Sequence, residues 1–174
     1  MKAPVPVVGF CAHSGTGKTT LLVQLLKILR ARGVRVGVIK HAHHNFDTDR
    51  PGKDSYELRK AGAQRMLVSS KRRWALVNEH VGEDRETPLE ELVAIVGGAP
   101  LDLILVEGFK HEPFPKIELH RKELKRPLLY PEDGNIIALA TNDKPDADIG
   151  IPVLDIDNPR AIADFLAALV AGDA

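Results

Sequence analysis

Apolar residues along the chain fall into short segments with two kinds of spacing. Residues 5–11 and 34–39 are continuous apolar runs rich in valine, which is typical of buried strands in a parallel sheet. Between them, residues 19–31 carry leucines at helical spacing and stop before Gly33, a residue that commonly ends a helix. The opening of the chain therefore predicts a strand, a loop, a helix and a second strand, the unit of a parallel α/β sheet.

The same alternation continues along the rest of the chain. Residues 54–63 fit a short helix. A further helix is expected to begin with Thr87 as its N-cap and Pro88 at its first position, and Glu90 completes a capping box. The remaining predicted elements are strands at residues 66–70, 74–79, 101–106, 116–120, 136–140 and 153–156, and a last helix at residues 159–170.

These elements predict the fold class. Strands that alternate with helices indicate an α/β protein with a parallel or mixed sheet flanked by helices. Residues 116–120 alternate polar and apolar side chains, as an exposed or edge strand does. We expect a single domain over residues 1–174, with strand extensions around residues 66–79 and 114–120 that are available for dimerisation.

Composition narrows the classes of partner. The chain carries 24 basic and 24 acidic residues, so no charge excess favours nucleic acid or an anionic membrane. Cys11 is the single cysteine, which rules out an intrachain disulfide and fits a reducing compartment. The apolar start lacks the cleavage site of a secretory signal, and no apolar run approaches the roughly 20 residues of a membrane span. We expect a cytoplasmic protein with no nucleic-acid or membrane partner.

The most informative segment is a phosphate loop of the Walker A type between the first strand and the first helix. It consists of Ala12, His13, Ser14, Gly15, Thr16, Gly17, Lys18 and Thr19, and Thr20 follows it. Its glycines let backbone N–H groups turn toward a phosphate, and the helix N-terminus adds a positive dipole end. We expect Lys18 to reach the β- and γ-phosphates as the catalytic cation and the Thr19 hydroxyl to bind Mg²⁺. The strand–loop–helix context favours a P-loop NTPase sheet over a glycine-rich turn without a ligand.

A second metal-side group is expected at the end of another buried strand. P-loop proteins hold Mg²⁺ through an acidic residue in that position. Glu107 follows the apolar residues 103–106 and precedes Gly108, which lets the chain turn close to the phosphates. We expect Glu107 near the Mg²⁺, through a water molecule; the alternative is an ordinary acidic residue at a strand end.

Three histidines follow the second strand, at the edge of a parallel sheet where ligands collect. His41, His43 and His44 fit three roles: contact with phosphates or substrate, ligation of a transition metal, or solvated loop residues. We favour a nucleotide contact for His41. No cysteine lies nearby, and no obvious fourth ligand completes a metal site.

Several other polar residues are open to more than one interpretation. Among the acidic residues that follow the histidines, Asp54 is the favoured candidate to touch the Mg²⁺ shell or to orient the attacking water. Residues 120–126 form a basic cluster that fits a lid over phosphates, a docking face or a solvated surface. The basic residues 71–73, beside Trp74, fit a contact for a phosphate-bearing ligand or a solvated turn.

A late strand ends in residues that suggest guanine recognition. Guanine-binding P-loop proteins often carry Asn-Lys-x-Asp after such a strand. Here Asn142 and Asp143 are followed by Lys144 and Asp146, one residue longer than that motif. We expect Asn142 and Asp143 to contact the base; the alternative is a polar turn.

Four segments together resemble the molybdopterin-guanine dinucleotide biosynthesis protein B (MobB) family. They are residues 14–20, 39–44 and 51–63, and residues 105–110 with 115–118. Gly-Lys-Asp-Ser-Tyr in the third segment and Glu-Gly-Phe-Lys in the fourth are more specific than the phosphate loop, which many families share. The resemblance covers most of the first 120 residues.

The resemblance implies a GTP- and Mg²⁺-binding homodimer that hydrolyses GTP weakly. It implies an adaptor that assists the attachment of GMP to molybdopterin, a reaction performed by a separate guanylyltransferase, and that also serves the enzymes that insert molybdenum. Molybdopterin or its guanine dinucleotide is a further expected ligand. In this chain the phosphate contacts fall on residues 14–20, with Mg²⁺ near Thr19 and Glu107.

Two other functions fit the same phosphate loop. A small-molecule kinase would use the basic residues 121–126 as a lid and Glu107 or Asp54 as its base, and a metal-insertion GTPase would use the three histidines as ligands. Slow hydrolysis is expected because no glutamine is placed to align water. His13 also stands where dimeric relatives that hydrolyse fast often carry a lysine.

Overall fold

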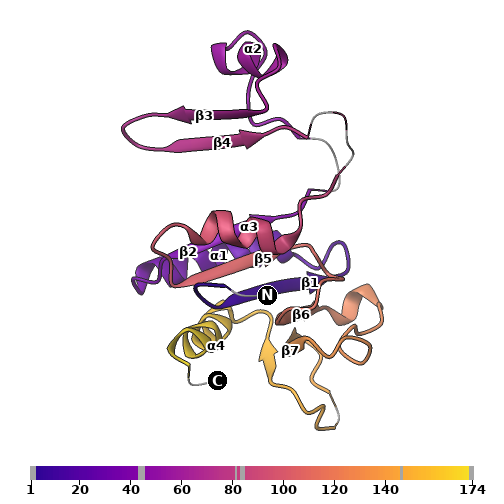
Figure 1. The fold of residues 1–174 in the computed structure, drawn as a ribbon. Coiled ribbons are helices and arrows are strands. Elements are labelled where there is room, and N and C mark those ends of the chain that lie inside the picture. Colours follow the sequence, from indigo (N-terminus) through magenta and orange to yellow (C-terminus); the bar gives the residue numbers. More distant parts are fainter. Residues whose placement is uncertain (1–2, 43–45, 81, 83–84, 146, 173–174) are drawn as a thin grey trace. The chain divides into compact units, whose positions relative to one another are not determined.

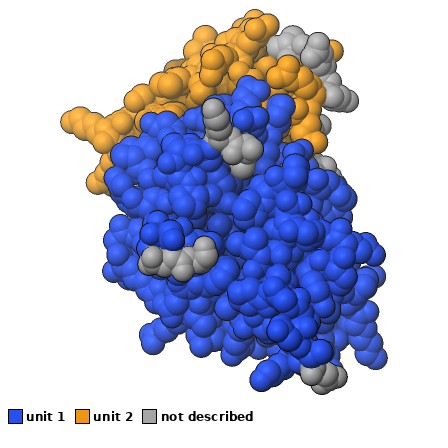
Figure 2. All heavy atoms as spheres, turned by 60° about the horizontal axis from the view of Figure 1, so that its bottom comes forward, with its two compact units in different colours: residues 1–41, 88–174 blue, residues 42–87 orange. Residues whose placement is uncertain are grey.

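The structure, a computed structural model, describes residues 3–42, 46–80, 82, 85–145 and 147–172. His43, His44 and Asp146, which the sequence analysis singled out, lie outside these residues. The chain divides into two compact units, residues 1–41 with 88–174 and residues 42–87 (Figure 2). Each unit is described by itself.

The first unit is built on a six-stranded sheet with the strand order β2-β5-β1-β6-β7-β8, and every described pairing in it is parallel (Figure 1). Its strands are β1 (Val7–Ala12), β2 (Val36–Lys40), β5 (Leu103–Glu107), β6 (Lys116–His120), β7 (Ile136–Thr141) and β8 (Val153–Asp155). Its helices are α1 (Lys18–Ala31), α3 (Leu89–Gly97), α4 (Pro159–Ala171) and a short 3₁₀ turn, η1 (Lys122–Leu124). The predicted α/β fold class with a parallel sheet is confirmed.

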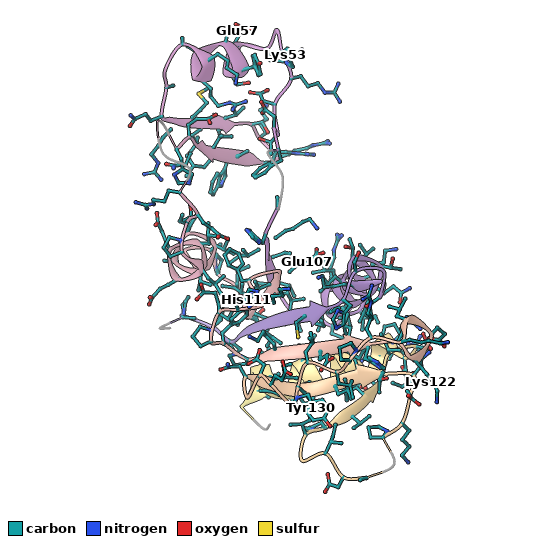
Figure 3. The ribbon with its side chains drawn as sticks, turned by 90° about the vertical axis from the view of Figure 1, so that its right-hand side faces the viewer. Lys53, Glu57, Glu107, His111, Lys122 and Tyr130 are labelled. Carbon is teal, nitrogen blue, oxygen red and sulfur yellow. The ribbon has the colours of Figure 1, made fainter. Side chains whose placement is uncertain are left out.

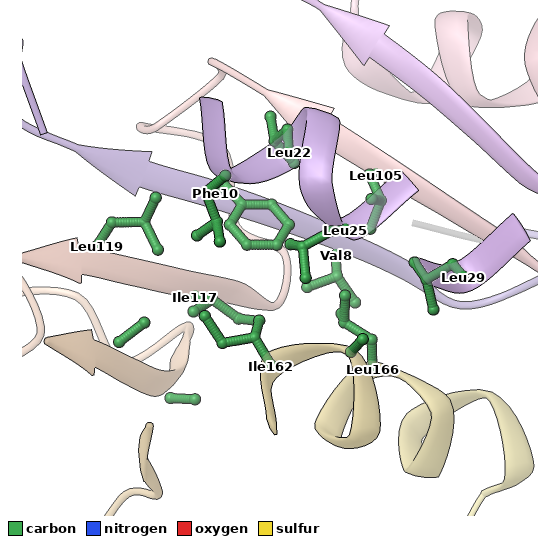
Figure 4. Close-up of a cluster of buried hydrophobic side chains, with 14 of the residues drawn as sticks. Val8, Phe10, Leu22, Leu25, Leu29, Leu105, Ile117, Leu119, Ile162 and Leu166 are labelled. Carbon is green, nitrogen blue, oxygen red and sulfur yellow. The ribbon is translucent and has the colours of Figure 1, made fainter. Parts of the chain in front are cut away.

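Helices cover both faces of this sheet because successive strand residues point to opposite sides. On one face, Leu25 of α1 and Ile162 of α4 pack with Phe10 of β1 in the larger apolar cluster (Figure 4). On the other face, Val93 of α3 packs with Val7 of β1 in a smaller cluster. Burial on both faces explains why the central strands are continuous apolar runs in the sequence.

The expectation of an edge strand at residues 116–120, and of an extension around residues 114–120, was wrong. β6 lies between β1 and β7, in the interior of the sheet. Lys116 is only 1% exposed, and its ammonium donates to the main-chain oxygens of Lys110 at 3.0 Å and Glu112 at 2.8 Å. It also pairs with the Asp133 carboxylate at 2.7 Å. These partners satisfy a buried charge, so a polar position that looked solvent-facing is internal.

Glu118 is the second buried charge of β6 and is also 1% exposed. Its carboxylate oxygens accept hydrogen bonds from the backbone N–H groups of Leu129 and Tyr130, each at 2.8 Å. Burial raises the pKa of Glu118 above its ordinary value, and the two N–H groups act against that rise. Beside it, burial raises the pKa of the Cys11 thiol to about 12, with the Glu118 charge as the next cause. Cys11 is therefore a packing residue and not a nucleophile.

One predicted helix start also differs from the structure. Helix α3 begins at Leu89, and Pro88 takes the N-cap position without a side-chain hydrogen bond. The hydroxyl of Thr87 lies 2.9 Å from the ring Nε2 of His80. The capping box expected from Thr87 and Glu90 therefore does not form, because the threonine hydroxyl is engaged elsewhere.

The second unit contains helix α2 (Asp54–Lys60) and an antiparallel hairpin of β3 (Arg65–Ser69) and β4 (Trp74–Asn78), which confirms the predicted helix and strand pair. The Arg59 side chain is 5% exposed and pairs with Asp47 at 2.7 Å and with Glu79. Across the described parts of both units, no helix combines the length and apolar character that crossing a bilayer requires.

We expect Asp133→Ala to lower the free energy of unfolding by about 3 kcal/mol, because it leaves the Lys116 ammonium buried without a counter-charge. Urea unfolding at neutral pH, followed by circular dichroism, measures this. Adding Lys116→Met should recover most of the loss. Asp164→Ala removes an exposed partner of Arg32 and should cost less than about 1 kcal/mol. Equal losses in Asp133→Ala and Asp164→Ala would contradict the buried pair.

Candidate functional site

The phosphate loop connects the end of β1 to the start of α1. Gly15 and Gly17 have φ angles of +84° and +89°, in the left-handed region that favours glycine. A Cβ atom at either position would meet no heavy atom within 4 Å, so the backbone conformation and not crowding requires glycine there. The buried Thr16 hydroxyl donates to the main-chain oxygen of His13 at 2.7 Å, which closes the loop on itself.

The loop forms a pocket of about 400 Å³. Its lining residues are His13, Ser14, Gly15, Thr16, Gly17, Lys18, Thr19, Thr20 and Glu107. Because α1 begins at Lys18, the first backbone N–H groups of the helix have no intrahelical partner, and they lie in this segment. The structure thus brings the predicted loop residues and Glu107 to one pocket whose backbone donors suit an anion.

Glu107 ends β5 (Figure 3), and its side chain contacts both the phosphate loop and the end of β2. One carboxylate oxygen accepts a hydrogen bond from the Thr19 hydroxyl at 3.1 Å, and the other pairs with the Lys40 ammonium at 3.0 Å. The Glu107 side chain is 13% exposed, whereas that of Lys40 is 59% exposed. A hydroxyl and a carboxylate at a phosphate loop are the hard oxygen donors that Mg²⁺ prefers. The residues present therefore fit a Mg²⁺ ion.

The turn after Glu107 depends on glycine. Gly108 has a φ angle of +103°, and a Cβ atom there would lie 2.5 Å from the Cβ of His41. The His41 ring centroid is 4.8 Å from that of Phe109, and its backbone N–H donates to the Glu107 main-chain oxygen at 2.8 Å. His41 thus lies against the metal-side turn and not in the described lining of the phosphate pocket.

The other candidates near the histidines stay predictions. Asp54 begins α2 in the second unit, so its role near the Mg²⁺ rests on the sequence alone. Within that unit, Asp47 pairs with Arg59. Two of the three histidines fall outside the described residues. Among all residues that the structure describes, no group of three or more His, Cys, Asp or Glu side chains is arranged to hold a metal.

The residues proposed to read guanine are engaged with the neighbouring 3₁₀ turn. The amide oxygen of Asn142 accepts the Lys122 backbone N–H at 3.1 Å, and its amide nitrogen donates to Glu123 at 2.8 Å. The carboxylate of Asp143 pairs with the Lys122 ammonium at 2.8 Å. These side chains hold η1 against the end of β7, and their contact with a base stays a prediction.

The fold brings near the loop three further residues to which the sequence alone assigns no firm role. Lys40 received no role from the sequence, yet it ends β2 and pairs with Glu107. Arg121 was part of a basic cluster left open between a lid over phosphates, a docking face and a solvated surface; in the structure its Nε donates to the Thr16 main-chain oxygen at 3.2 Å. The same guanidinium pairs with Asp157 at 2.8 Å. The sequence does contain one signal for Lys40, Arg121 and Asp157: each ends or follows a strand of one parallel sheet, and the carboxyl ends of such strands lie at the same edge.

Comparison with known proteins identifies the family. The family described as "Molybdopterin guanine dinucleotide synthesis protein B" matches residues 7–142. The chain is 48% identical over 166 residues to the molybdopterin-guanine dinucleotide biosynthesis adapter protein of Escherichia coli, covering 95% of this chain and 93% of that protein. It is 42% identical to the Haemophilus influenzae protein of the same name, covering 95% and 90%.

The fold agrees as well. A crystal structure of Bacillus subtilis MobB superimposes with a TM-score of 0.70 at 27% sequence identity, covering 94% of this chain and 97% of that one. The family match spans the phosphate loop, Glu107 and the strands that connect them. The chain therefore belongs to the molybdopterin guanine dinucleotide synthesis protein B family.

Proposed function

We propose that the chain is a Mg²⁺-dependent GTP-binding adapter in molybdenum cofactor biosynthesis, which assists the attachment of GMP to molybdopterin. The observation that carries this proposal is the pocket in which a Walker A loop brings its Thr19 hydroxyl to Glu107. The family relatives are named adapter proteins of molybdopterin-guanine dinucleotide biosynthesis, which supports a role beside another enzyme.

Different residues of the pocket would contact different parts of the Mg²⁺-nucleotide. Backbone N–H groups of the loop donate to the β-phosphate, and Lys18 contacts the β- and γ-phosphates. The Thr19 hydroxyl and Glu107 would hold the Mg²⁺ ion, which neutralises phosphate charge when it is bound. Lys40 pairs with Glu107 and so keeps that carboxylate oriented toward the loop.

The same residues support at most a weak GTPase. His13 occupies the second position of the loop, and its ring Nε2 lies 3.0 Å from the main-chain oxygen of Pro127. It therefore supplies no mobile cation to the γ-phosphate. Arg121 is tied to Thr16 and Asp157. Little transition-state stabilisation beyond Lys18 is then expected, which suits a protein that delivers nucleotide or cofactor.

The second unit supports a homodimer. Large apolar side chains are exposed on it: Phe46, Leu58, Leu67, Val68 and Trp74. Leu67 and Val68 are neighbours in β3, so they point to opposite faces of the hairpin. A two-stranded hairpin with exposed apolar residues on both faces is marginal alone. We propose that a second copy of the chain covers this hairpin.

The dimer would act in the cytoplasm, where it serves a guanylyltransferase and molybdenum-insertion enzymes. Molybdopterin or its guanine dinucleotide would be a further ligand.

Glu107→Gln tests the metal-side role. We expect the affinity for Mg²⁺-GTP to fall about tenfold, because a charged partner of the metal is lost, while binding measured in excess chelator changes little. Isothermal calorimetry in both conditions measures this, with Asp164→Asn as a control at an exposed carboxylate. Equal losses with and without Mg²⁺ would count against a metal ligand.

A reconstituted transfer assay tests the adapter role. Purified chain is added to the guanylyltransferase with molybdopterin, GTP and Mg²⁺, and formation of the dinucleotide is followed. The wild-type chain should raise the initial rate, and Lys18→Ala should lose the effect because its GTP affinity falls about tenfold or more. Lys27→Ala, at an exposed position of α1, should behave as wild type. No stimulation by the wild-type chain at any concentration would contradict an adapter.

A further inference from the structure

A second pocket, of about 250 Å³, shares a wall with the phosphate pocket. Thr16, Gly17 and Thr20 line both pockets. On its far side the second pocket is lined by Arg121, which follows β6, and by Asp157, which follows β8. A nucleotide whose phosphates occupy the loop therefore has an adjoining space for its sugar and base.

One carboxylate is built into the wall of this space. The Asp157 side chain pairs with the Arg121 guanidinium at 2.8 Å, and the same guanidinium donates to the Thr16 main-chain oxygen at 3.2 Å. The Asp157 backbone N–H also donates to the Asp155 carboxylate at 2.8 Å. Asp157 is thus fixed relative to the phosphate loop through a short chain of contacts. A carboxylate accepts about four hydrogen bonds, so the pair with Arg121 leaves acceptor capacity for a ligand.

The residues suggested by the imperfect guanine motif are less well placed. The Asn142 amide uses its oxygen on the Lys122 backbone and its nitrogen on Glu123. Asp143 pairs with the Lys122 ammonium. Neither Asn142 nor Asp143 belongs to the described lining of the pocket that adjoins the loop. Reading a base with them would require these local contacts to break.

We propose that Asp157 is the residue that selects guanine, by accepting hydrogen bonds from N1–H and the 2-amino group of the base. Guanine presents these two donors side by side, which matches the two oxygens of a carboxylate. Adenine has an acceptor at N1 and no donor at C2, so it would leave Asp157 without a partner. Arg121 is a positioning residue that holds Asp157, and its planar guanidinium offers a stacking surface for the base.

This assignment rests on the proposed GTP-binding function, and a change of base specificity tests it. Xanthine carries a carbonyl at C2 in place of the 2-amino group, so it matches an amide side chain, which has one acceptor and one donor. Wild type should bind GTP in preference to XTP. Asp157→Asn should lose about tenfold or more in GTP affinity and gain affinity for XTP, reversing the order.

Calorimetric titration of GTP, XTP and ATP into wild type and four variants, the first of them Asp157→Asn, separates the outcomes. Asp143→Asn tests the rival motif, and Asp164→Asn is a control at an exposed carboxylate of α4 that is not among the residues lining the pocket. Asp157→Ala should lose discrimination between GTP and ATP without gaining XTP binding. It therefore tests the role of Asp157 even if Asp157→Asn does not fold. Circular dichroism checks that each variant is folded.

A gain of XTP binding in Asp157→Asn alone supports the assignment. If wild type prefers GTP but both Asp157 variants keep that preference, or if Asp143→Asn gains XTP binding, the assignment is overturned and the GTP-binding function stands. If wild type shows no preference for GTP, the proposed function itself fails, together with the guanine assignment.

Discussion

The parallel pairing of β1 with β5 on one side and β6 on the other is the constraint on which the site depends. This pairing aligns Phe10 with Glu107, so the strand that leads into the phosphate loop ends beside the metal-side carboxylate. Parallel strands present their carboxyl ends at one edge, and every group assigned to the site arises there. The hydrogen bond between Thr19 and Glu107 is the direct result of this register.

The buried charged residues of β6 also depend on the pairing of β6 with β1. Gly9 of β1 has no side chain, and a Cβ atom there would lie 2.8 Å from the Lys116 side chain and 2.7 Å from the Phe114 ring. Lys116 therefore packs its stem against β1 while its ammonium is satisfied by Asp133 and main-chain oxygens. An interior strand of the sheet that positions the loop thus holds charged residues whose hydrogen-bond partners are protein groups and not water.

Much of the fold was predictable because its signals are local. Apolar runs and leucine spacing located the strands and helices, and the Walker A loop and Glu107 were recognisable from their place after buried strands. Strand order was not predictable, because alternation on β6 gives the same pattern for an exposed edge and for an internal strand with paired charges. Asp157 received no role from the sequence and Arg121 stayed undecided for a different reason: β6 and β8 are distant in sequence and come together only through the sheet.

The central claim is that this edge of the sheet binds GTP with Mg²⁺ and holds it without rapid turnover. Calorimetric titration of the wild-type chain with GTP, GDP and ATP in the presence of Mg²⁺, combined with a phosphate-release assay, tests it most directly. The account predicts tight binding of GTP, clearly weaker binding of ATP, and hydrolysis far slower than the roughly 1–100 per second of ordinary kinases. Preference for ATP, or rapid turnover with a small phosphoryl acceptor, would contradict it.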